Sequence, residues 1–146
     1  MPETPPAPSA IRTLPSWLLG RAAARGRALV ADALAAEGMR MWHHVVLSAV
    51  ADLGPVAQAE LGRSVSLDPK DMVGVLNGLQ DAALIERTPD PRDRRKNAVT
   101  ITPEGRLLLD RCTQAAHRAN AELLAPLTPE ERDRFIDMLT RVMTTA

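Results

Sequence analysis

The sequence is poor in several residue types on which common functional classes depend. Of its 146 residues one is cysteine, two are tryptophan, one is phenylalanine and none is tyrosine. The single thiol, Cys112, forms no intrachain disulfide, which fits a reducing cytoplasm. So few aromatic side chains cannot build a stacking platform for single-stranded nucleic acid.

The chain also lacks an excess of either charge and any long apolar run. Lysine and arginine number 18, aspartate and glutamate number 18, and the formal net charge is zero. A uniformly basic coat for nucleic acid is therefore excluded, and any such contact must come from a local patch. No stretch approaches the roughly 18 apolar residues of a membrane span. Residues 1–8 have neither the basic end nor the apolar stretch of a secretory signal. We expect a cytoplasmic protein with no membrane partner.

Motifs of catalysis are missing as well. The sequence has no glycine-rich phosphate loop, no nucleophile motif and no paired carboxylates on an apolar face. We therefore expect neither an enzyme nor a cofactor. A zinc site built from His43, His44 and His117 is also not expected, because adjacent histidines on a helix point about 100° apart. The expected state of Cys112 is a buried, inert thiol.

What is present indicates one mainly helical domain. The chain is 45% hydrophobic and 25% charged, and its length suits a single core. Four prolines in the first ten residues predict a disordered arm over 1–13, followed by a single domain over 14–146. Periodicity and breakers predict helices over 14–37, 40–53, 56–63 and 102–124, with others beginning at Pro69 and Pro129.

Helical spacing and capping signals predict which side chains are buried. The short helix is expected to turn Ala59 and Leu61 inward, Asp68 to cap the helix that begins at Pro69, and Thr128 and Glu131 to form a capping box. For the helix over 40–53 the expected apolar stripe is Trp42, Val45, Val46, Ala49, Val50 and Leu53. For the helix that begins at Pro69 it is Met72, Val75, Leu76 and Leu79.

The only convincing strands, 84–88 and 98–102, flank a polar segment and predict a hairpin. Its tip, 92–96, holds four cations and one acid, a net charge of +3. The order of elements is therefore a helix-turn-helix followed by a two-stranded wing, an arrangement that places the second helix of the motif in the DNA major groove. The wing would reach the DNA backbone or minor groove.

Three segments around this hairpin resemble the wing signature of the MarR family of bacterial transcriptional regulators. They are 84–87 (Leu-Ile-Glu-Arg), 90–95 (Asp-Pro-Arg-Asp-Arg-Arg) and 99–105 (Val-Thr-Ile-Thr-Pro-Glu-Gly). Upstream, 58–61 and 67–79 match the usual helix-turn-helix pattern, and the resemblance covers nearly all the chain from Leu14. It implies a winged helix-turn-helix lobe over about 54–102 and a homodimer joined through about 14–37 and 103–146.

The apolar residues of the last two helices agree with a dimer, because they exceed what one small lobe can bury. They are Leu107, Leu108, Leu123, Leu124, Leu127, Phe135, Leu139 and Val142. A two-fold dimer would present its recognition helices roughly 34 Å apart to a near-palindromic operator, and the protein would associate with the nucleoid.

The resemblance also predicts the DNA-contacting residues. Many relatives carry arginines on the exposed face of the recognition helix, where this chain has Gly74 and Gly78. Gly74 would allow close approach, Lys70, Asp71 and Asn77 remain for base edges, and Ser66 for phosphate. On the wing, the expected contacts are Arg92, Arg94, Arg95 and Lys96, with Arg95 in the minor groove.

Two acids are expected to orient the wing. Asp93 would shape its tip, and Asp68 would pair with Arg95 and so tie the wing to the recognition helix. Ala83 stands where the family usually has a glycine before the wing, a change expected to affect only the local turn.

The family's effectors are small aromatic acids and phenols that bind between the dimerisation helices and the DNA lobe. Trp17, Arg21, Trp42, His43 and His44 would supply an apolar wall and a cation for such a ligand. The alternative for the two histidines is ordinary packing.

The predicted function is a homodimeric, sequence-specific repressor released by such an effector. The alternative is a winged-helix dimer that binds a protein or small molecule and has weak or no sequence-specific DNA binding. Gly74, Gly78 and the zero net charge favour that second interpretation.

Overall fold

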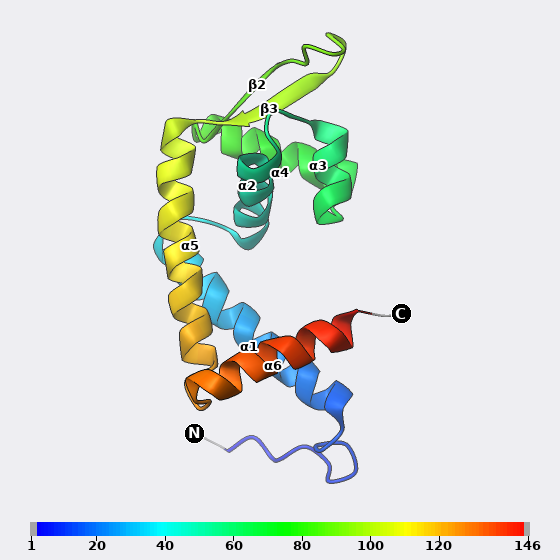
Figure 1. The fold of residues 1–146 in the computed structure, drawn as a ribbon, viewed down its shortest axis with the longest axis vertical. Helices are drawn as coiled ribbons and strands as arrows, with labels where there is room; N and C mark the ends of the chain where they lie inside the picture. The colour runs from blue at the N-terminus through cyan, green and yellow to red at the C-terminus, as the bar shows by residue number, and fades with distance from the viewer. Residues whose placement is uncertain (1–2, 145–146) are drawn as a thin grey trace. The chain divides into compact units, whose positions relative to one another are not determined.

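A computed structural model describes residues 3–144, which form six helices and three short strands (Figure 1). The expected mainly helical, winged fold is confirmed, and most element ends lie within one or two residues of the expected positions. In chain order the elements are α1 (Pro15–Ala36), α2 (Met41–Leu53), β1 (Val56–Ala57), α3 (Gln58–Val65), α4 (Pro69–Asp81), β2 (Ile85–Pro89), β3 (Asn97–Ile101), α5 (Pro103–Leu123) and α6 (Pro129–Met143).

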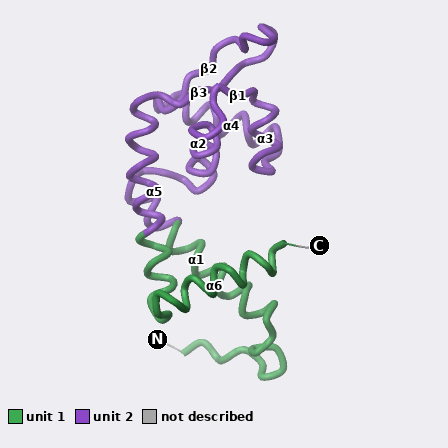
Figure 2. The backbone as a smooth tube through the Cα atoms, in the orientation of Figure 1, with its two compact units in different colours: residues 1–30, 118–146 green, residues 31–117 purple. Residues whose placement is uncertain are grey.

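The chain divides into two compact units (Figure 2). One contains residues 1–30 and 118–146, and the other, which we call the winged unit, contains 31–117. The winged unit is wider than the expected lobe over 54–102, because α2 and parts of α1 and α5 cluster with the wing. In the arm, residues 3–8 have no regular structure, whereas Ile11 closes a turn by donating its N–H to the Pro8 carbonyl at 3.1 Å. Disorder of the arm stays a prediction.

The sheet of the winged unit has a third strand that the sequence did not predict. Its order is β1-β3-β2, antiparallel throughout, with Val56 opposite Val99 and Ile85 opposite Ile101. The expected helix start at Val56 is wrong, because Val56 and Ala57 pair with β3 and α3 begins only at Gln58. Two residues give no alternation that a sequence pattern could reveal.

The core of the winged unit lies between the sheet and α2, α3 and α4. The four residues of α4 that were expected to be buried, Met72, Val75, Leu76 and Leu79, are buried. The interior also contains Leu34, Val46, Leu47, Val50, Leu61, Leu84, Ile85 and Val99.

The expected buried stripe of α2 is partly wrong. Val46 and Val50 are buried, but Leu47 completes the buried face, while Trp42 is 49% exposed and Val45 and Leu53 are also exposed. The face is rotated because α3, α4 and β3 all contact α2 and together cover the side that carries Leu47. Ala59, expected to face inward, is exposed on α3.

The segment from Thr102 to Gly105 connects the wing to the start of α5 through hydrogen bonds and close backbone packing. Thr102 is buried, donates its hydroxyl to the Ala83 carbonyl at 2.7 Å and accepts the Gly105 N–H at 3.0 Å. A Cβ at Gly105 would collide with the Leu84 carbonyl oxygen, which itself accepts the Thr102 N–H at 3.0 Å. Glycine is therefore required here by the close approach of two backbones.

The other unit has hardly any interior of its own. The predicted capping box is confirmed, with Thr128 accepting from the Glu131 N–H at 3.2 Å and Glu131 accepting from the Thr128 N–H at 2.9 Å. No residue of α6 is buried, and Ile136 is 54% exposed. Other exposed apolar side chains of this unit are Leu14, Leu18, Leu19, Met138 and Val142.

Candidate nucleic-acid interface

The N-terminus of α4 is fixed by a capping residue, Asp68. Asp68 accepts the Lys70 N–H at 2.7 Å and Pro69 occupies the first turn, as the sequence predicted. Ser66, exposed before this helix, ends α3 in the left-handed region with φ of 55°. These caps hold the α3–α4 turn and leave Ser66 and Lys70 exposed beside the start of α4.

The outward face of α4 follows from its buried one. Lys70, Asp71, Gly74 and Asn77 are exposed, and among the described residues nothing beyond the adjoining helix backbone and chain neighbours lies within 4 Å of the place where a Gly74 Cβ would be. Val73, which was not among the predicted DNA contacts, shares this face and is 43% exposed. The structure therefore brings these expected contact residues together on one open surface.

Gly78 does not belong to that surface. A Cβ at Gly78 would lie 2.9 Å from Nε2 of His43 in α2, so this glycine faces the neighbouring helix. The expectation that Gly74 and Gly78 both lie on the exposed face is wrong. Four residues advance a helix by more than one full turn, which carries Gly78 round toward α2.

Arg87 of β2 reaches across to α4. Its Nε donates to Oε1 of Gln80 at 2.6 Å, and its Nη2 donates to Oδ1 of Asn77 at 2.6 Å. Arg87 belongs to the wing signature over 84–87, but no function was predicted for it. No function was predicted for Gln80 either. Their spacing of seven residues crosses a helix end and a turn, and no periodicity rule predicts such a contact.

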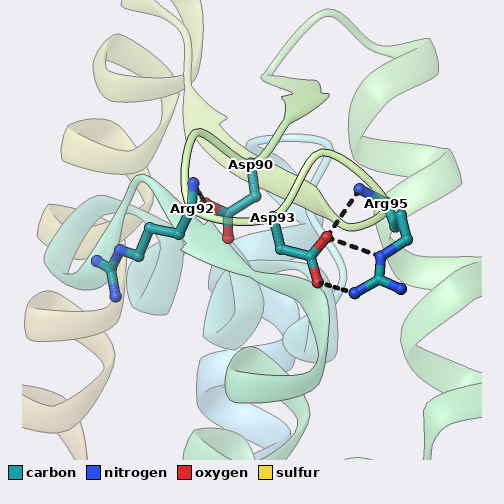
Figure 3. Close-up of polar contacts among 4 residues, drawn as sticks. All are labelled: Asp90, Arg92, Asp93 and Arg95. Carbon is teal, nitrogen blue, oxygen red and sulfur yellow. Dashed lines mark hydrogen bonds and ion pairs between the residues drawn. The ribbon is translucent and has the colours of Figure 1, made fainter.

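The wing tip is shaped by two acids (Figure 3). Asp93 accepts from the Arg95 N–H at 3.1 Å and from its guanidinium Nε at 3.1 Å and Nη2 at 3.4 Å. Asp90 accepts the Arg92 N–H at 2.9 Å, while the Arg92 side chain extends away from the Asp93–Arg95 pair (Figure 3). Hydrogen bonds from the Arg95 side chain and then its backbone lower the pKa of the Asp93 carboxyl. This geometry agrees with the interpretation that Asp93 shapes the tip.

The expected pair between Asp68 and Arg95 is not formed. The Asp68 carboxylate caps α4, and the Arg95 guanidinium, 91% exposed, pairs with Asp93 instead. Asp93 is only two residues from Arg95, so their pairing closes a very short loop at little cost in chain entropy. A pair between Arg95 and Asp68 would have to close a much longer loop.

A groove of about 810 Å³ runs along α2 and α4 in the winged unit. Its charged residues are the cations Arg40 and Lys70 and the acid Asp71, and Trp42 and His43 also line it. Gly74 and Gly78 line its floor without side chains. Trp42 and His43 were predicted to line an effector site. Lys70 was predicted to contact DNA, and no role was predicted for Arg40.

The other expected effector residues do not line this groove of the winged unit. Trp17 and Arg21 belong to the other unit, where the Arg21 guanidinium lies 5.9 Å from the Trp17 ring centroid. His44 lies on α2 but does not line the groove.

Burial favours the neutral form of the two histidines of α2. Burial lowers the pKa of His43, with Arg40 as a second cause, and burial lowers the pKa of His44. His43 Nδ1 and His44 Nε2 are buried, and neither has a hydrogen-bond partner among residues 3–144. Burial disfavours a charged imidazole, so neither histidine supplies a cation to the groove near neutral pH.

Other sites receive little support from the residues that the structure describes. Cys112 is buried, and burial raises the pKa of its thiol, followed by the nearby Glu37. Over residues 3–144 no group of three or more acidic, histidine or cysteine side chains is placed to hold a metal ion. Within the same range no helix is long and apolar enough to span a membrane.

Comparison with known proteins places this geometry among bacterial regulators. A model described as MarR family matches residues 37–96. The transcriptional repressor Rv2887 of Mycobacterium tuberculosis is 32% identical over 126 residues, covering 86% of this chain and 91% of the repressor. The repressor NicR of Pseudomonas putida is 32% identical over 99 residues, covering 68% of this chain but only 63% of NicR.

Solved structures give the same result. Rv2887 in complex with DNA superposes with a TM-score of 0.77 at 30% identity, covering 88% of this chain and 97% of that one. Rv2887 has also been solved with p-aminosalicylic acid. BpsR of Bordetella bronchiseptica, whose DNA binding is described as regulated by 6-hydroxynicotinic acid, superposes with a TM-score of 0.79 at 26% identity, covering 97% of this chain and all of that one.

Proposed function

The chain belongs to the MarR family of transcriptional regulators, and from this premise we propose that it is a homodimeric repressor released from its operator by a small aromatic acid. The observation that carries the proposal is the open face of α4 beside a wing tip of net charge +3. Such a lobe concentrates in one place the positive charge that the whole chain lacks. The regulator would act in the cytoplasm, at the nucleoid.

DNA contact divides between the two exposed elements. On α4, Lys70, Asp71, Gly74 and Asn77 would meet base edges in the major groove, with Ser66 on a neighbouring phosphate. Because Asp93 already orients the Arg95 guanidinium, Arg95 would enter the minor groove with less conformational freedom to lose. The remaining wing cations, Arg92, Arg94 and Lys96, would contact phosphates.

The dimer is proposed from the uncovered apolar surface of α1, α5 and α6. Leu18 is 51% exposed, Ile136 is more than half exposed, and α6 has no buried residue. Fully burying one such side chain contributes about 1.5–3 kcal/mol, so a second copy of the chain would stabilise this unit substantially. A two-fold arrangement would pair the two winged units with the halves of a near-palindrome.

The effector is proposed to bind in the groove between α2 and α4. The exposed Trp42 indole offers a flat apolar wall, and Arg40 and Lys70 offer cations for a carboxylate. Lys70 also belongs to the DNA-facing surface, so a bound acid would compete with DNA for the same ammonium. DNA and effector are then coupled reciprocally through one equilibrium. Contributions from Trp17, Arg21 and His44 stay a prediction.

Binding to the intergenic DNA upstream of the protein's own gene tests the proposal. Arg95→Ala is expected to weaken specific binding by at least about fivefold, because a base or minor-groove contact is worth about 1–3 kcal/mol. Arg12→Ala, which removes the same charge from the N-terminal arm, is the matched control and is expected to bind like the native protein. Equal loss in both variants would mean that only net charge matters.

The second candidate function is a dimeric module that binds a small molecule without sequence-specific contact to DNA. The bare Gly74 position favours it, since part of the α4 face offers no side chain for base readout. No preference of the native protein for upstream over random DNA at low salt, together with binding of an aromatic acid, would support this function instead.

A further inference from the structure

We propose that Arg87 determines the base preference of α4 by fixing the orientation of the Asn77 side-chain amide. The inference rests on the proposed DNA-binding function and deepens it, because it states which base edges the recognition helix accepts. It makes Arg87 a positioning residue and Asn77 the residue that meets DNA.

The orientation follows from donor and acceptor chemistry. A guanidinium carries only N–H donors, so an amide within hydrogen-bond distance of it must turn its oxygen toward it. The Asn77 oxygen is 2.6 Å from Arg87 Nη2, and the Gln80 oxygen is 2.6 Å from Arg87 Nε. Both amide NH₂ groups are therefore directed away from Arg87.

Two hydrogen bonds from Arg87 together restrict the rotation of the Asn77 and Gln80 amides. Asn77 and Gln80 lie three residues apart on α4, and therefore on neighbouring positions of one helix face. The planar guanidinium spans them with two different nitrogens, and rotation of either amide would place an NH₂ group against an N–H donor. We call the contact of Arg87 with Asn77 and Gln80 the Arg87 clamp. The clamp also joins β2 to α4, a link that was expected from a pair between Asp68 and Arg95.

The clamp leaves the charge of Arg87 in place. Among the described residues the Arg87 contacts are to neutral amides, whereas Arg95 is paired with the Asp93 carboxylate. A positive charge behind the amides favours partners that present oxygen or nitrogen lone pairs to the Asn77 NH₂ group.

The consequence for readout is specific. An unconstrained asparagine recognises adenine with both of its polar atoms, accepting from N6 and donating to N7. Arg87 occupies one of the two lone pairs of the Asn77 oxygen and places a positive charge beside the other, which disfavours a further donor such as N6 of adenine. The Asn77 NH₂ group therefore dominates the contact, and its donors match the paired acceptors N7 and O6 of guanine or O4 of thymine. Cytosine presents only a donor at this edge and is rejected. Val73, exposed one turn earlier, is suited to contact a thymine methyl group.

Selection of bound sequences from a random duplex library by the native dimer tests the inference. The position read by Asn77 is the one whose preference disappears in Asn77→Ala. There, the native protein is expected to favour guanine or thymine over adenine and cytosine by about tenfold. In Arg87→Gln, adenine is expected to become acceptable at that position, because the amide is free to rotate.

Arg92→Gln is the matched control, because it removes the same charge from the wing tip, where the Arg92 backbone is bonded to Asp90 rather than to the α4 amides. It is expected to weaken binding to all sequences alike and to leave the preference unchanged, and circular dichroism spectra confirm that each variant is folded. Adenine selected by the native protein, no changed position in Asn77→Ala, or an unchanged preference in Arg87→Gln would each overturn the inference while leaving DNA binding intact. Failure of the native protein to select any sequence would instead overturn the proposed function, and the inference with it.

Discussion

Ala83 lies in the left-handed backbone region with φ of +60°, and replacing it by glycine is expected to stabilise the protein. It follows the α4 cap residue Ala82, and the two hydrogen bonds that define a Schellman ending are present. The Leu84 N–H donates to the Leu79 carbonyl and the Ala83 N–H to the Gln80 carbonyl, both at 2.9 Å. The glycine usual in the family at this point is therefore explained by backbone conformation.

The magnitude follows from two opposing terms. An L-residue in the left-handed region costs about 1–2 kcal/mol, which glycine does not incur. Glycine also gives the unfolded chain more conformational entropy, which lowers the expected gain in the free energy of unfolding by about 0.5–1 kcal/mol. The Ala83 methyl group is exposed, so its removal loses almost no packing. Ala83→Gly is therefore expected to raise the free energy of unfolding by about 0.5–1 kcal/mol, a shift in Tm of about 1–4 °C.

Urea unfolding followed by circular dichroism, at one fixed protein concentration, measures this change. Ala82→Gly is the matched control, because Ala82 has an ordinary φ of −83° and is also exposed. That variant is expected to lose about 0.5–1 kcal/mol. If Ala83→Gly destabilised the protein as much as Ala82→Gly does, the left-handed strain assigned to Ala83 would be refuted.

Three further predictions concern packing, pH and assembly. Gly105→Ala should reduce the free energy of unfolding by at least about 2 kcal/mol, since its Cβ would meet the Leu84 backbone; unfolding like that of the native protein would contradict this. The pKa of His44 is lowered in the folded state, so the unfolded chain binds the proton first and stability should fall as pH drops below about 6.5. His44→Gln should lessen that fall in urea unfolding between about pH 7.5 and 5.5, and a fall as steep as that of the native protein would contradict the prediction. Ile136→Glu should shift the native dimer toward monomer in sedimentation, and an unchanged mass would count against α6 as dimer surface.

Local chemistry predicted much of the fold. The Asp68 and Thr128 caps, the buried face of α4 and the strands of the wing each depend on neighbours within one or two turns, and each is present in the structure. The positive tip was equally predictable, because four of its five residues are cations.

Contacts across the lobe could not be predicted in the same way. The stripe of α2 depends on which elements cover it, so Leu47 rather than Trp42 is buried. Gly78 was misplaced because only the packing of α2 shows that it faces His43. The Arg87 clamp joins a strand to the preceding helix, and its partner amides carry no charge that would have marked them in the sequence.

The salt dependence of binding to a selected operator tests the central claim most directly. The three wing cations assigned to phosphates in each of two lobes, Arg92, Arg94 and Lys96, predict that log K falls with log salt with a slope of about −5 for the native dimer. Affinity should then drop on the order of 10³-fold between about 50 and 200 mM salt, and Arg94→Ala should reduce the slope by about 2, one contact per lobe. A slope near zero would contradict a DNA-binding wing.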